Sequence, residues 1–117
     1  MKKFYYLRTC DTCSRIMKEL ELPQEVELRE IKSDPVTSEE LQQMHDLTKS
    51  YEALFNKRAR LYRERNLKEK NLEETDYKNL ILEEYTFLKR PVLIIDDQIF
   101  VGNSKKTVAA ARQALSS

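Results

Sequence analysis

The feature that most constrains the fold is a pair of cysteines, Cys10 and Cys13, placed between the apolar run 4–7 and a stretch whose apolar residues recur at helical spacing. A strand that ends in a C-x-x-C motif and continues as a helix directs free backbone N–H groups and the positive end of the helix dipole at the first sulfur. This environment favours the thiolate, which is the nucleophilic form of cysteine. The motif therefore predicts a strand-to-helix junction with one reactive sulfur, Cys10, and with Cys13 one helical turn behind it.

Two other interpretations of the motif are weaker. A zinc site needs four ligands, whereas the chain has no third cysteine and only one histidine, His45, in a distant charged stretch. A structural disulfide at this spacing would close a very small loop, which removes little entropy from the unfolded chain. Redox chemistry without a bound metal is the favoured interpretation.

Composition and charge exclude several classes of protein. The 117 residues suffice for one domain with a modest core. The 21 basic and 20 acidic residues nearly balance, which argues against direct nucleic-acid binding and against attraction to a membrane surface. No segment approaches the ~20 apolar residues of a membrane span, and the basic start Met1–Phe4 predicts a first strand rather than a signal peptide. Paired cysteines in such a chain indicate catalysis or sensing in the reducing cytoplasm.

Residues 1 to about 35 have the pattern of a β-α-β unit. The first strand is predicted at Lys2–Leu7, and a helix from about Thr12 to Glu21 is ended by Pro23. Three polar residues are candidates to cap this helix: Asp11, Thr12 and Ser14. Three apolar residues mark the alternating second strand: Val26, Leu28 and Ile31.

Residues 37 to about 88 have apolar residues at helical spacing, which predicts a mainly helical segment. Thr37 and Glu40 form a capping box ahead of the first helix. A short helix is predicted at 51–55, and a third helix opens at 71–74. We expect His45 to be an exposed helical residue with no partner.

Residues 90–117 return to a β-β-α pattern. A dense apolar strand at 92–95 is followed by a tight turn, a second strand at 99–101 and a final helix. Four apolar residues mark that helix: Val108, Ala109, Ala111 and Leu115. The β-α-β and β-β-α halves predict an α/β, thioredoxin-like fold, in which helices flank a four-stranded mixed sheet. Residues 1–117 would form a single domain with a helical insertion at about 37–88.

Three segments carry a resemblance to a known family. They are YLRTCDTC at 6–13, ALFNKR at 53–58 and LKRPVLI at 88–94. The first occupies the family's cysteine loop, the second matches its LLNKR stretch, and the third matches the Arg-Pro run before a buried strand. Over essentially its full length, the chain resembles the arsenate reductase family, the group of ArsC, Spx and YffB proteins.

The resemblance implies roles for individual residues. It implies a cis Arg90–Pro91 bond beside the active cysteine, with the Arg90 guanidinium directed at the Cys10 sulfur. A fixed cation there would stabilise the thiolate and bind an oxyanion in bidentate fashion. Thr12 and Pro91 would help to bind substrate, and Arg58 with Arg60 would form a second anion clamp. Two alternatives exist for the basic run that contains both arginines: a solvated surface and, less favoured because the domain is nearly neutral, a docking surface for nucleic acid or protein.

The family implies a cytoplasmic thiol-dependent oxidoreductase. Cys10 would attack an oxyanion or a mixed disulfide, and Cys13 would resolve the adduct. No bound cofactor is expected, and the reductant would be an external thiol system, either glutathione with glutaredoxin or thioredoxin. The chain departs from arsenate-reducing members at Arg8 and Thr9, and at 102–104, where those members carry a further arginine. The alternative is an Spx-like redox-sensing regulator that binds RNA polymerase.

Overall fold

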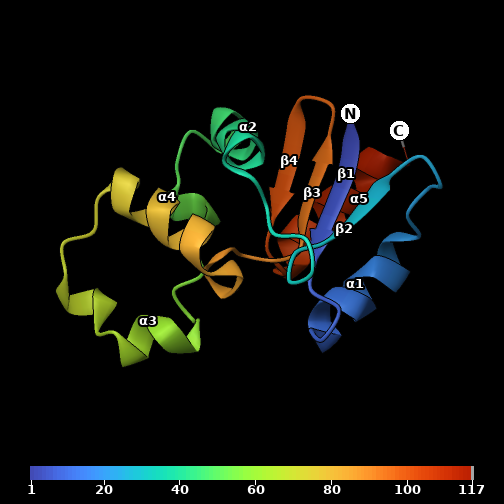
Figure 1. Cartoon of the computed structure of the whole chain (residues 1–117). Coiled ribbons are helices and arrows are strands. Elements are labelled where there is room, and N and C mark those ends of the chain that lie inside the picture. Colours follow the sequence, from blue (N-terminus) through green and yellow to red (C-terminus); the bar gives the residue numbers. More distant parts are fainter. Residues whose placement is uncertain (117) are drawn as a thin grey trace. The chain divides into compact units, whose positions relative to one another are not determined.

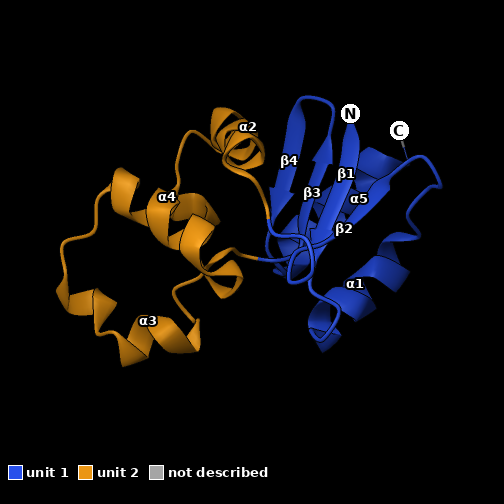
Figure 2. Ribbon diagram, in the orientation of Figure 1, with its two compact units in different colours: residues 1–35, 90–117 blue, residues 36–89 orange. Residues whose placement is uncertain are grey.

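The computed structural model describes residues 1–116, and the chain divides into two compact units. The first unit combines residues 1–35 with the residues from Arg90 onward, and the second spans residues 36–89 (Figure 2). The predicted organisation as one domain stays a prediction. No helix within residues 1–116 is long and apolar enough to cross a membrane.

The first unit is built on one four-stranded sheet with the order β2-β1-β3-β4 (Figure 1). The strands are β1 (Lys2–Tyr6), β2 (Glu27–Glu30), β3 (Val92–Ile95) and β4 (Gln98–Val101). Strand β1 runs parallel to β2 and antiparallel to β3, and β3 pairs with β4 as an antiparallel hairpin. The α/β class and the four-stranded mixed sheet are therefore confirmed.

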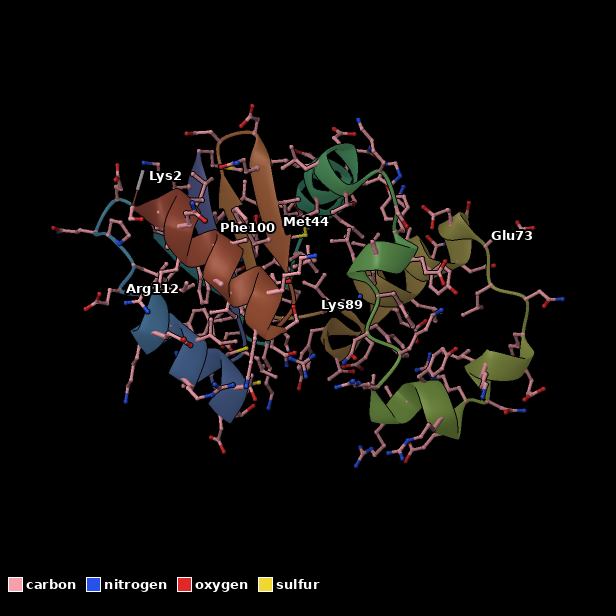
Figure 3. The ribbon with its side chains drawn as sticks, turned by 180° about the vertical axis from the view of Figure 1, so that it is seen from behind. Lys2, Met44, Glu73, Lys89, Phe100 and Arg112 are labelled. Carbon is pink, nitrogen blue, oxygen red and sulfur yellow. The ribbon has the colours of Figure 1, made fainter. Side chains whose placement is uncertain are left out.

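Two helices, α1 (Asp11–Leu20) and α5 (Lys105–Leu115), pack together on one face of this sheet. Helix α1 places Ile16 and Leu20 one turn apart, so both side chains face the sheet. Eight buried residues form this core: Phe4, Ile16, Leu20, Val26, Leu93, Ile95, Val108 and Ala111. Phe100, labelled in Figure 3, packs against it from β4. Ala109, expected on the apolar face of α5, is exposed.

The start of α1 differs from the prediction that a polar side chain caps it. The N-cap residue is Cys10 itself, and no side chain makes a capping hydrogen bond there. The Cys10 carbonyl accepts the first helical hydrogen bond, from the N–H of Ser14, at 3.1 Å. The N–H groups of the first turn are therefore left for another acceptor.

Strand β2 is shorter than its apolar pattern predicts. Val26 and Ile31 are buried just beyond its two ends, whereas Leu28 within the strand is 51% exposed. Strand β2 is an edge strand, so its pairing with β1 covers only one side of it. The apolar residues that anchor this segment are therefore the ones that flank it.

The second unit contains three α-helices within residues 36–89: α2 (Ser38–Thr48), α3 (Arg60–Glu64) and α4 (Glu74–Glu83). The predicted capping box at the start of α2 is confirmed, because the Glu40 N–H donates to Thr37 Oγ1 and the Thr37 N–H donates to Glu40 Oε1. Short 3-10 turns lie at Glu52–Leu54, Leu67–Glu69 and Tyr85–Phe87. The sequence pattern did not indicate α3, which buries no residue.

An aromatic cluster organises the second unit. The Phe55 ring lies 5.0 Å from that of Phe87, 4.9 Å from that of Tyr77 and 5.8 Å from that of Tyr62, between ring centroids. Phe55 also forms a β-bridge with Leu88. The cluster therefore ties together segments that are far apart in sequence.

The expectation that His45 is exposed and has no partner is wrong. Its ring stacks on Tyr51 with centroids 4.2 Å apart. Its Nε2 lies 3.9 Å from Glu74 Oε1, and its side chain is 29% exposed. These partners follow His45 in sequence by several residues or more, so periodicity along α2 does not reveal them.

We expect the core beneath α1 to dominate the stability of the first unit. Leu20→Ala should lower the free energy of unfolding by about 2–5 kcal/mol, since it opens a cavity in a packed core. Leu28→Ala, the same substitution at an exposed position, should change it by about 0.5 kcal/mol or less. Urea denaturation followed by circular dichroism measures both, and equal losses in the two variants would contradict the described packing.

Candidate active site

Cys10 lies in a tight connection between β1 and α1. Its backbone N–H donates to the carbonyl of Leu7 at 3.1 Å, and its φ of −92° and ψ of 109° are those of an extended N-cap residue. An N-cap side chain is positioned to accept hydrogen bonds from the first-turn N–H groups. Here that side chain carries a half-buried sulfur.

The surroundings of Cys10 stabilise its thiolate. Partial burial raises the pKa of the Cys10 thiol, but stronger combined effects lower it below the usual value. The effects that lower this pKa come from the backbone N–H and the thiol of Cys13, from the positive charge of Arg90 and from the backbone N–H of Thr12. The helix-start N–H groups and the Arg90 charge thus act on the pKa of Cys10 in the direction that the sequence predicts.

Cys13 has the opposite environment. It lies within the first turn of α1 and is fully buried. Burial raises the pKa of the Cys13 thiol to about 11, and the neighbouring Cys10 sulfur adds to this increase. The Leu7 N–H and the Arg90 charge act in the other direction but do not outweigh burial. One motif thus holds a thiol of lowered pKa next to a thiol of raised pKa.

Arg90 and Pro91 join the cysteine loop in the first unit. The Arg90–Pro91 peptide bond is cis, which confirms the expectation. Pro91 is buried directly before β3, and its carbonyl accepts the Gly102 N–H at 2.9 Å. Arg90 is half-buried, and its charge lowers the pKa of Cys10. The structure therefore gathers Cys10, Cys13, Thr12, Arg90 and Pro91 in one unit.

Arg58 and Arg60 lie in the second unit, and both are exposed. The backbone N–H of Arg58 donates to Asn56 Oδ1 at 3.0 Å. The guanidinium of Arg60 lies 3.5 Å from Glu64 Oε1, and its side chain is 79% exposed. The predicted part of these arginines in an anion clamp stays a prediction.

Glu30 is a residue that the sequence patterns did not single out. It ends β2, and its carboxylate accepts backbone hydrogen bonds from Arg8, Lys32 and Ser33. The N–H of Arg8 makes the largest contribution to a pKa of about 2 for Glu30, followed by the N–H of Ser33. A glutamate among the other charged residues of an edge strand offers no sequence signal for such a role. A contact between the β2 end and the cysteine loop can be found only in three dimensions.

No group of three or more His, Cys, Asp or Glu side chains among residues 1–116 is arranged to hold a metal ion. The candidate site brings together two sulfurs, the N–H groups of a helix start and the guanidinium of Arg90. Such a set can ionise one thiol, direct it at an electrophile and supply a second thiol next to it.

Comparison with known proteins identifies the family. The family model of the ArsC family matches residues 5–111. None of the curated protein sequences matches the chain.

Solved structures match over nearly the whole chain. An ArsC family related protein from Bacteroides fragilis is 26% identical, with a TM-score of 0.78 over 94% of this chain and 96% of that one. A protein from Staphylococcus aureus is 26% identical, with a TM-score of 0.73 over 94% of this chain and 97% of that one. An arsenate reductase from Vibrio cholerae shares the fold at 17% identity, with a TM-score of 0.78 over 94% and 96%. The fold and the match over residues 5–111 agree, and the chain belongs to the ArsC family.

Proposed function

We propose that this protein is a thiol-dependent oxidoreductase in which Cys10 is the nucleophile and Cys13 resolves the adduct. The observation that carries the proposal is the placement of two neighbouring thiols, with Cys10 half-buried at the N-cap of α1 and Cys13 fully buried in its first turn. This placement lowers the pKa of Cys10 and raises that of Cys13 to about 11. A nucleophile needs to be ionised before substrate arrives, whereas a resolving thiol is best kept protonated until the adduct has formed. Membership of the ArsC family supports the same class of chemistry.

With a disulfide substrate, the reaction has two exchange steps. The Cys10 thiolate attacks one substrate sulfur, forms a mixed disulfide and expels the other sulfur as a thiolate. Cys13 then loses its proton and attacks the Cys10 sulfur, which releases the second substrate thiolate and leaves a Cys10–Cys13 disulfide. Two electrons and two protons have passed to the substrate. An external dithiol restores the enzyme by the reverse exchange.

With an oxyanion substrate, the same residues would act in the same order. The Cys10 sulfur bonds to the central atom as one oxygen, after protonation, leaves as water. Cys13 then attacks that sulfur and forms the Cys10–Cys13 disulfide, which breaks the bond between sulfur and the central atom and releases the reduced oxyanion with the electron pair of that bond. The two thiols supply the two electrons that reduce the central atom. Arg90 would hold the negative charge of the oxyanion, which a guanidinium binds in bidentate geometry.

We extend the proposal to the remaining candidate residues and to the partners. Thr12 and Pro91 would line the position of the substrate beside Cys10. Arg58, which ends the stretch 53–58 that resembles the family, and Arg60, two residues beyond it, would supply further positive charge to an anionic substrate. The reductant would be glutathione with glutaredoxin, or thioredoxin, in the cytoplasm. No cofactor would be bound.

Single-cysteine variants test the order of the two thiols. Cys10→Ser should abolish reduction of a disulfide substrate such as hydroxyethyl disulfide, since no thiolate remains to attack. Cys13→Ser should stop after the first step and accumulate a mixed disulfide on Cys10, which intact-mass spectrometry detects. Arsenate is assayed in parallel as the oxyanion substrate.

The reverse pattern would overturn the roles, with the adduct trapped on Cys13 in Cys10→Ser. A wild-type protein that forms the Cys10–Cys13 disulfide but turns over neither substrate would instead support the redox-sensing class of protein.

The contribution of Arg90 can be measured on the thiol itself. Arg90→Ala should raise the pKa of Cys10 and slow its alkylation at neutral pH by about three- to tenfold, because one nearby positive charge is lost. Arg90→Lys should recover most of this rate and little of any bidentate anion binding. Arg112→Ala, which removes an exposed arginine from α5, is the matched control. An alkylation profile of Arg90→Ala that equals the wild-type profile would show that the guanidinium does not act on the sulfur.

A further inference from the structure

The Glu30 carboxylate joins two loops at one edge of the sheet. Its Oε2 accepts the backbone N–H of Arg8 at 2.9 Å. Its Oε1 accepts the N–H of Lys32 at 3.1 Å, together with the N–H and the hydroxyl of Ser33 at 2.8 and 2.9 Å. One oxygen thus binds the loop that leads to Cys10, and the other binds the turn that follows β2.

The Arg8 N–H belongs to the same peptide group as the Leu7 carbonyl, and this group is planar. That carbonyl accepts the N–H of Cys10 at 3.1 Å. The Leu7–Arg8 peptide group is therefore held at both ends, by the Glu30 carboxylate on one side and by the Cys10 N–H on the other. Rotation of this peptide plane would break both hydrogen bonds at once.

We propose that Glu30 is a positioning residue for the reactive thiol. By fixing the plane of the Leu7–Arg8 peptide, it holds Cys10 at the N-cap position of α1, next to the unsatisfied N–H groups of the first turn. The inference rests on the proposed role of Cys10 as the nucleophile. Glu30 does not touch the sulfur and acts only through the backbone.

Physical reasons favour a carboxylate for this task. A hydrogen bond between an ionised carboxylate and a backbone N–H is roughly twice as strong as a neutral one. The bond also polarises the peptide group, so the Leu7 carbonyl becomes a better acceptor for the Cys10 N–H. Arg8 and Thr9 are exposed, so no side-chain burial fixes this part of the loop. The bonds from Lys32 and Ser33 hold Oε1 and keep Oε2 directed at Arg8.

A simple charge effect predicts that the pKa of Cys10 changes in the opposite direction in Glu30 variants. A nearby negative charge disfavours a thiolate, so removing the Glu30 charge would lower the pKa of Cys10 if charge alone mattered. Loss of positioning withdraws N–H donors from the sulfur and raises this pKa. The direction of the change in Glu30 variants therefore separates the two mechanisms.

The test measures the pH profile of Cys10 alkylation with iodoacetamide in three proteins that all carry Cys13→Ser: one with Glu30 unchanged, one with Glu30→Gln and one with Glu30→Asp. In Glu30→Gln, the Cys10 pKa should rise and the rate at neutral pH should fall by about three- to tenfold, because a neutral amide accepts the Arg8 N–H less strongly. Aspartate at position 30 keeps the charge and can still accept the backbone N–H groups of Lys32 and Ser33. Its side chain is one methylene shorter than that of glutamate, so we expect that it does not reach the N–H of Arg8. Glu30→Asp should therefore show the same slow alkylation.

Glu74→Gln is the matched control, since Glu74 also accepts two backbone N–H groups, from Tyr51 and Glu52, within the second unit. It should leave the Cys10 profile at its wild-type value. A profile that is unchanged or moved to lower pH in both Glu30 variants would overturn the inference. If wild-type Cys10 itself shows no lowered pKa, the proposed nucleophile fails instead, so the two failures are distinguishable.

Discussion

The site depends on one constraint, the position of Cys10 as the N-cap residue of α1, which places its sulfur next to the unsatisfied backbone N–H groups of the first helical turn. The helix begins at Asp11, and against the raising effect of burial the backbone of Cys13 and Thr12 lowers the pKa of the Cys10 thiol. No polar side chain satisfies these first-turn N–H groups, so the cysteine occupies the place that serine, threonine or aspartate commonly holds. The absence of a conventional cap, which is a small cost to the helix, thereby becomes a source of thiolate stabilisation.

The two sulfurs differ because burial and hydrogen bonding act on them in different proportions. Cys10 is half-buried and receives several donors, whereas Cys13 lies inside the packed interface of α1. Arg90 acts on both, but only at Cys10 do the favourable contributions together exceed the burial effect. The sheet makes this arrangement possible. The cysteine loop follows β1, Pro91 directly precedes β3, and β1 and β3 are neighbouring strands.

Sequence patterns predicted the parts of the molecule that depend on local periodicity. The helix behind the motif, the dense strand at β3 and the Thr37–Glu40 capping box follow from spacing and capping chemistry. Sequence patterns did not predict the features that depend on contacts between distant segments. Glu30 bonds to Arg8 only because β2 pairs parallel to β1, and His45 meets Glu74 only through tertiary packing. Helix α3 was not predicted, because it buries no residue and its sequence therefore shows no apolar stripe.

The most direct test is a pH titration of both thiols in the reduced wild-type protein, observed by NMR through ¹³C-labelled cysteine Cβ atoms. The account predicts that Cys10 ionises below the ordinary cysteine range and that Cys13 stays protonated until a pH of about 11. Two thiols that titrate together, or a Cys13 that ionises first, would contradict it. Because the two signals come from one molecule under one set of conditions, differences in stability between variants cannot account for the result.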